Sequence, residues 1–166
     1  SKAYPNGESY GNIKISLVKI NGEDATTTLE GDDKTILNVA LSSSLYPNDR
    51  VNIEFEYMVT LPNINHRFGY GDNAINLCNF YPIACVFENG NFSKQEYHYN
   101  GDPFYSDMAN YDVTIKNFEN YTVATSGNQV SQEIVDHQKI TKVQAKAVRD
   151  FAIVLSNKFK TASQKV

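Results

Sequence analysis

The sequence predicts an all-β fold, either an antiparallel β-sandwich or a saddle-shaped pair of sheets, with at most one short helical turn. Two observations predict it. Apolar and polar residues alternate with a period of two over about ten short segments, as they do in half-buried strands. Turn-forming residues interrupt these segments about every 8–12 residues, which is the spacing typical of antiparallel sandwiches.

The clearest predicted strand covers residues 51–59, where Val51, Ile53 and Phe55 alternate with polar residues. In chain order, the predicted strands are residues 13–17, 37–41, 51–59, 81–88, 92–99, 111–118, 121–125, 130–135, 140–147 and 149–156.

Turn chemistry separates these strands. Asn21-Gly22 and Asn89-Gly90 favour two-residue hairpin turns, because both central residues of such a turn need a positive φ. Further turns are predicted at residues 30–33, 46–49 and 126–128. The one helical turn is predicted over residues 103–110, since Asp102 can cap a helix whose first position is Pro103.

Length and composition indicate a globular domain. With 166 residues and 41% hydrophobic residues the chain can bury a core, and we expect one β-domain over residues 1–157. Residues 158–166 are expected to be a tail or the start of a connector. The chain opens Ser-Lys-Ala-Tyr without an initiator Met, so we expect it to be part of a longer protein.

The charge pattern argues against two classes of partner. The net charge of −4 comes from acids spread along the chain, which disfavours nucleic acid as a partner. No apolar run approaches the roughly 20 residues of a membrane span, so no membrane contact is expected. Cys78 and Cys85 are expected to be free thiols, because an extended segment between them exceeds the roughly 7 Å reach of a disulfide.

The histidines do not form a zinc site. His66, His98 and His137 each lack a second histidine at helical spacing, so the HExxH zinc signature is absent. Glu96 and His98 would share one face of a predicted strand and could both touch a metal. The favoured interpretation is that they lie on the solvated face of an edge hairpin.

Other side chains have the residue types of a site without the required spacing. Asp102, Asp107 and Asp112 could surround calcium, but they are sparser than a calcium loop, and capping explains Asp102. Ser106 with His98 and Asp107 has the residue types of a catalytic triad, but no elbow glycines flank the serine. We therefore assign no catalytic, cofactor-binding or metal-binding residue.

Arg67 could clamp a carboxylate, although a structural ion pair at the base of a loop is favoured. Tyrosine numbers 11, and core or sheet packing is favoured over a sugar-binding or interface role. The tyrosines of the second half are Tyr97, Tyr99, Tyr105, Tyr111 and Tyr121. The glycosylation patterns that start at Asn91 and Asn120 are expected by chance in an Asn-rich chain.

The order of aromatics, prolines and acids over residues 79–115 is distinctive: NFYPIACVFENGNFSKQEYHYNGDPFYSDMANYDVTI. It resembles the N-terminal domain of the aminopeptidase N family, the zinc-dependent gluzincin aminopeptidases that include leukotriene hydrolase. The resemblance keeps its order over about residues 11–159, through segments 13–22, 37–41, 51–62, 67–69 and 148–152. The last segment, Val-Arg-Asp-Phe-Ala, is similar to that of bacterial members. The family's first strands normally precede Ile13 and are missing or truncated here.

The resemblance implies a non-catalytic piece of a peptidase. Zinc and the catalytic residues would belong to a later domain of the parent protein, and that catalytic domain would be the natural partner. The chain would wall off one side of its active-site cleft and expose an apolar, aromatic patch where it docks. No residue here matches the family's Gln or Glu motif for the substrate's amino terminus. The alternative is a stand-alone β-sandwich binding or adhesion module at a cell surface, and an extracellular or cell-surface location is expected.

Overall fold

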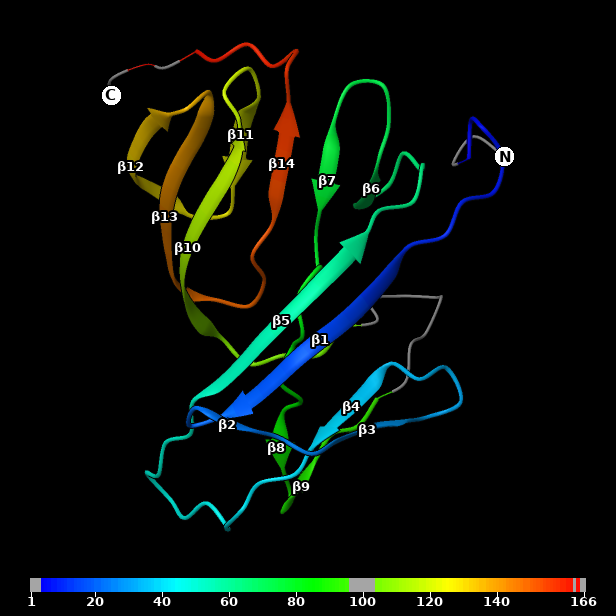
Figure 1. Ribbon diagram of the computed structural model, residues 1–166, viewed down its shortest axis with the longest axis vertical. Coiled ribbons are helices and arrows are strands. Elements are labelled where there is room, and N and C mark those ends of the chain that lie inside the picture. Colours follow the sequence, from blue (N-terminus) through cyan, green and yellow to red (C-terminus); the bar gives the residue numbers. More distant parts are fainter. Residues whose placement is uncertain (1–3, 96–103, 163, 165–166) are drawn as a thin grey trace. The chain divides into compact units, whose positions relative to one another are not determined.

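The computed structural model describes residues 4–95, 104–162 and 164. Every regular element within these residues is a β-strand, and all pairs of named strands are antiparallel (Figure 1). The predicted all-β class is therefore confirmed. A search of the described residues finds no helix that is long and apolar enough to cross a membrane.

The chain forms two compact units. Residues 1–11, 61–83 and 107–166 make up the first unit, and residues 12–60 and 84–106 make up the second. The expectation of one domain over residues 1–157 stays a prediction, because two compact units can belong to one domain.

The first unit has two sheets that share one hydrophobic core, a sandwich-like arrangement. One sheet has the order β10 (Ala109–Phe118), β13 (Gln138–Val148), β12 (Asn128–Val135). The other has the order β11 (Thr122–Thr125), β14 (Ile153–Ser156), β7 (Ile75–Leu77), β6 (Phe68–Tyr70).

Side chains that alternate along the strands build this core. In β13, Thr141, Val143 and Ala145 are buried while the residues between them are exposed, so one face of the strand points into the unit. The buried cluster consists of Ile115, Val143, Ala145, Phe151, Ile153 and Leu155. Both sheets contribute to it, which is the expected way for two half-buried sheets to remove their apolar faces from water.

The second unit has three smaller sheets, each built from neighbouring hairpins or strands. They are β2 (Glu23–Asp24), β1 (Asn12–Ile20), β5 (Ile53–Thr60); β3 (Thr27–Glu30) with β4 (Ile36–Val39); and β8 (Phe87–Glu88) with β9 (Asn91–Phe92). The predicted turns at Asn21-Gly22 and Asn89-Gly90 are both confirmed, with positive φ at all four residues.

Several predicted elements are wrong. Residues 81–86 form no strand, and only Phe87–Glu88 of the predicted segment 81–88 is paired. Asn79 has a φ of 53° and Pro82 has no amide hydrogen, so this stretch cannot join a ladder although its side chains are partly buried. The segment 149–156 is a strand only from Ile153.

The predicted helical turn over residues 103–110 is also wrong where the structure describes it. Residues 104–108 are irregular, and β10 already begins at Ala109, opposite Val148. A single helical turn has little stability of its own, and pairing of β10 fixes an extended backbone instead. In the predicted strand 92–99, Asn91–Phe92 pairs with β8, and residues 96–99 lie outside the described residues.

Candidate functional site

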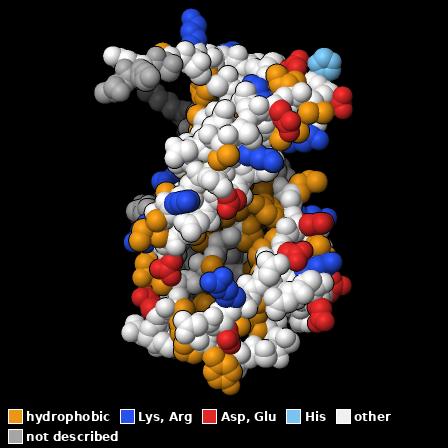
Figure 2. Space-filling view, turned by 90° about the vertical axis from the view of Figure 1, so that its left-hand side faces the viewer, with side chains coloured by type: hydrophobic (Ala, Val, Ile, Leu, Met, Phe, Trp, Pro, Cys, Tyr) orange, Lys and Arg blue, Asp and Glu red, His pale blue; other side chains and the backbone are white. Residues whose placement is uncertain are grey.

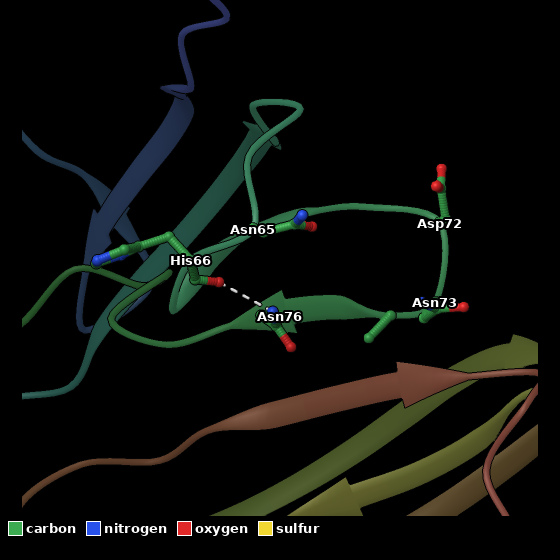
Figure 3. Close-up of a pocket in the computed structure, with 6 residues that line it drawn as sticks. Asn65, His66, Asp72, Asn73 and Asn76 are labelled. Atoms are coloured by element: carbon green, nitrogen blue, oxygen red, sulfur yellow. Dashed lines mark hydrogen bonds between the residues drawn. The ribbon is translucent and has the colours of Figure 1, made fainter. Parts of the chain in front are cut away.

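A polar hollow of about 310 Å³ lies beside the β6–β7 loop in the first unit (Figure 3). Its lining residues come from the segment before β6, from the loop itself and from β7: Asn65, His66, Asp72, Asn73, Ala74 and Asn76. Glycines permit this close packing. A Cβ on Gly69 would lie 2.5 Å from Ile64 Cγ2, and one on Gly71 would overlap Asn65 Oδ1.

Asn73 and the Asp72 carbonyl already accept hydrogen bonds from within the chain. Lys158 Nζ donates to Asn73 Oδ1 at 2.9 Å and to Asp72 O at 3.2 Å, and Ser156 Oγ donates to Asn73 O. The Lys158 ammonium thus occupies the place that a bound cation would take among these oxygens. This arrangement does not favour a metal at the loop.

His66 does not complete a catalytic arrangement at the hollow. Its carbonyl accepts a hydrogen bond from Asn76 Nδ2 at 2.9 Å, whereas its imidazole points away from Asp72 and Asn73 (Figure 3). The rim offers amide and carboxylate groups that can hydrogen-bond a polar molecule, but it pairs no nucleophile with a base. This hollow was not predicted from the sequence, although its lining residues all lie between Asn65 and Asn76.

Of the three acids considered for calcium, Asp107 and Asp112 are among the described residues. Asp112 accepts a hydrogen bond from Gln144 Nε2 at 2.6 Å across the β10–β13 pair, while Asp102 lies outside the described residues. Within residues 4–95, 104–162 and 164, no three His, Cys, Asp or Glu side chains form a group that could hold a metal ion. The described histidines, His66 and His137, belong to no such group, and His98 lies outside the described residues.

The remaining predicted candidates are only partly described. Glu96 and His98 lie outside the described residues. The metal pair and the triad with Ser106 therefore stay untested. Ser106 is buried, and Arg67 is exposed just before β6, where its carbonyl accepts from Cys78 N at 3.2 Å. Cys78 and Cys85 are free thiols, as predicted.

The tyrosines divide between core and surface. Tyr111 and Tyr121 pack against the core of the first unit, and Tyr105 is exposed in the second, while Tyr97 and Tyr99 lie outside the described residues. For Tyr111 and Tyr121, core packing is therefore confirmed. The two glycosylation-pattern asparagines, Asn91 and Asn120, are both exposed.

A hydrogen-bonded aromatic cluster joins the segments that carry the family resemblance. Phe151 N donates to Tyr81 Oη at 3.1 Å, and Tyr81 Oη donates to Tyr111 Oη at 3.1 Å. The Tyr111 ring stacks on Phe151 at 5.5 Å, and Asn79 Nδ2 donates to Asp150 Oδ1 at 3.2 Å. These residues therefore hold the first unit together.

Tyr111 remains protonated in this cluster. Burial raises its pKa well above the usual 10.0, and the hydrogen bond with Tyr81 raises it further. Its hydroxyl is therefore a donor at neutral pH and points toward Arg149 O at 3.4 Å. The role of the cluster is structural.

The second unit presents apolar side chains at its surface. Figure 2 shows hydrophobic side chains at the molecular surface. Phe87 and Phe92 form the most distinct pair, with 61% and 59% of each residue exposed and their ring centroids 5.1 Å apart. Among the described residues, this pair is the most distinctive candidate contact surface.

Comparison with known proteins finds no relative: no family model, curated protein or solved structure matches the chain. The resemblance to aminopeptidase N domains therefore stays a prediction.

Proposed function

We propose that this chain is a non-catalytic N-terminal domain of an aminopeptidase-N-like zinc metallopeptidase. In this proposal it packs on the catalytic domain of its own parent chain and limits access to the active-site cleft. Zinc belongs to that catalytic domain, and the present chain contributes a wall of the cleft.

The observation that carries the proposal is the contrast between the two units. The first unit has a core that both of its sheets share. In the described part of the second unit, the buried hydrophobic residues are Val18 and Val86. The exposed large hydrophobic residues of the second unit are Ile13, Leu29, Leu41, Leu45, Tyr46, Ile53, Met58, Phe87, Phe92, Phe104 and Tyr105. So much exposed apolar surface supports a partner that covers it.

The aromatic cluster fits the accessory role that this proposal gives the chain. Three segments of the resemblance, represented by Tyr81, Tyr111 and Phe151, meet in one hydrogen-bonded group of the first unit. Packing and hydrogen bonding explain why these three aromatic residues occur in the sequence, and no catalytic role is needed to explain them. This fits an accessory domain whose sequence is constrained by its fold, while the catalytic groups lie elsewhere in the parent.

The deciding experiment is to sequence the native reading frame beyond Val166. The proposal expects a helix with HExxH and a downstream Glu, the ligand set of a gluzincin. The full-length product should bind zinc and release 4-nitroaniline from leucine 4-nitroanilide. Replacing the Glu of HExxH with Gln is the control, because it should abolish activity while the protein stays folded.

A frame that stops soon after Val166, or that continues into another sandwich, would refute the proposal. The remaining hypothesis would then be a stand-alone cell-surface binding or adhesion module. A thermal-shift screen of this chain against a glycan panel tests that hypothesis, and a saturable sugar ligand would support it.

A further inference from the structure

Three Asn-Gly pairs lie within the described residues: Asn6-Gly7, Asn21-Gly22 and Asn89-Gly90. An asparagine followed by glycine is prone to spontaneous deamidation, because no Cβ on the glycine hinders the approach of its amide nitrogen to the asparagine side chain. Both residues of each pair are exposed to solvent, so exposure does not rank the three pairs. The hydrogen bonds of the asparagines do rank them.

The reaction needs only the chain itself and water. The glycine nitrogen bonds to the asparagine Cγ while the bond from Cγ to Nδ2 breaks, and the glycine amide proton leaves with Nδ2 as ammonia. Water then opens the resulting succinimide ring at one of its two carbonyls and restores the N–H group. The products are aspartate and isoaspartate, so the net change is the gain of one water, the loss of one ammonia and the conversion of an amide into a carboxylate.

Hydrogen bonds hold two of the three asparagines in place. Asn21 Oδ1 accepts from Asn52 N at 3.0 Å, and Asn21 N donates to Asn52 O at 2.8 Å. Asn6 Nδ2 donates to Asn63 Oδ1 at 2.9 Å. In both cases the side chain must give up a partner before its Cγ can turn toward the glycine nitrogen, which slows the first step.

Asn89 is free of this restraint. Within residues 4–95, 104–162 and 164, no hydrogen bond holds its side chain. A Cβ built on Gly90 would meet nothing within 4 Å, so the space beside the attacking nitrogen is open. The supporting strands β8 and β9 have two residues each, and so short a hairpin opens easily to let the asparagine side chain rotate.

We propose that Asn89-Gly90 is a site of spontaneous deamidation in the folded chain, and that it reacts first among the Asn-Gly pairs of the described residues. The product adds one negative charge next to Glu88 in a chain whose net charge is already −4. The isoaspartate form leads the main chain through the former side chain. It therefore lengthens the turn by one bond and disturbs the direct pairing of Phe87 with Phe92. This inference is independent of the proposed function.

Peptide mapping by mass spectrometry tests the inference. The folded 166-residue chain is incubated at mildly alkaline pH, and the conversion of amide to acid is followed at each of the three pairs. Asn89 should deamidate about two- to tenfold faster than Asn21 or Asn6, which is the rate factor that one ordinary hydrogen bond represents. Equal rates at the three pairs, or a slower rate at Asn89, would overturn the inference.

Two controls show whether the folded structure sets this order. In concentrated urea the hydrogen bonds of Asn6 and Asn21 are lost, so the three rates should become similar, and an order that persists unchanged would refute the argument. In the folded variant Asn63→Ala, Asn6 loses its partner, so its rate should rise toward that of Asn89 while the rate at Asn89 stays the same. An unchanged rate at Asn6 in this variant would equally refute the claim that a hydrogen bond to the side chain protects an Asn-Gly pair.

Discussion

Replacing Tyr81 with Phe should destabilise the chain strongly, because one hydroxyl connects three segments. Tyr81 Oη accepts from Phe151 N and donates to Tyr111 Oη, both at 3.1 Å. Phe151 is 2% exposed, so its amide has no access to water once the hydroxyl is removed. The substitution keeps the aromatic ring and its packing, which isolates the hydrogen bonds.

The magnitude follows from those two bonds. A buried amide left unpaired costs about 1–3 kcal/mol, and an ordinary lost hydrogen bond costs about 0.5–1.5 kcal/mol. We therefore expect Tyr81→Phe to lower the free energy of unfolding by about 2–4 kcal/mol. Tyr111→Phe should cost less, about 1–2 kcal/mol, because the bond from Phe151 N to Tyr81 survives.

Urea denaturation of the single and double variants measures these values. The slope of unfolding free energy against urea should stay constant while the midpoint falls. The cycle should give a coupling of about 0.5–1.5 kcal/mol between the two tyrosines. A loss below about 0.5 kcal/mol for Tyr81→Phe, or a coupling of zero, would refute the claim that this hydrogen-bonded chain holds the segments together.

Three further predictions concern backbone strain, close packing and pH. Ala147 has a φ of 53°, so Ala147→Gly should raise the free energy of unfolding by about 1 kcal/mol, and an unchanged urea midpoint would contradict this. Gly69→Ala should lower it by about 1–3 kcal/mol or more, since its Cβ would meet Ile64 at 2.5 Å; a thermal melt at the wild-type temperature would disprove the clash. The hydrogen bond from Lys94 lowers the pKa of Glu30 from 4.5, so its stabilising contribution is present above pH 4.5 and is lost as the pH falls through the lowered value. The difference in urea midpoint between wild type and Glu30→Gln should therefore shrink between pH 7 and pH 3, and a constant difference would rule out this linkage.

Residue type predicted correctly those turns and strands whose conformation depends on neighbouring residues in the sequence. Asn21-Gly22 and Asn89-Gly90 were predicted as hairpin turns because their residue types accept positive φ, and they have it. Asp136 and His137 have φ values of 48° and 60° with no glycine, so the turn between β12 and β13 carried no comparable signal. Alternation likewise predicted most of β13, where one face is buried.

Long-range pairing was the part that the sequence concealed. β6 and β7 are three residues each, and no local period marks such short segments. The long-range partner of β7 is β14, near the other end of the chain. In the opposite direction, the apolar run from Tyr81 to Val86 suggested a strand, yet its backbone joins no ladder. Lys158 donates hydrogen bonds to Asp72 and Asn73, more than 80 positions earlier in the chain, and no spacing rule predicts this contact.

The exposed phenylalanine pair could have been found from the sequence. In a two-residue hairpin turn, the residues two positions before and two positions after the turn are direct cross-strand partners. Phe87 and Phe92 hold these two positions around Asn89-Gly90. Their exposure, in contrast, depends on what else packs against the hairpin. The family resemblance implied a docking patch, and that patch stays a prediction.

The interleaving of the two units has a consequence for synthesis on the ribosome. The second unit occupies residues 12–60 and 84–106, between parts of the first, so the first unit is completed last. Ser156 binds the carbonyl of Asn73, a residue 83 positions earlier, and β14 pairs with β7 over a similar separation. β7 can pair with β6 early, but it gains β14 as its second partner only after that strand has left the exit tunnel. Slow folding and a dependence on chaperones during translation are the expected result.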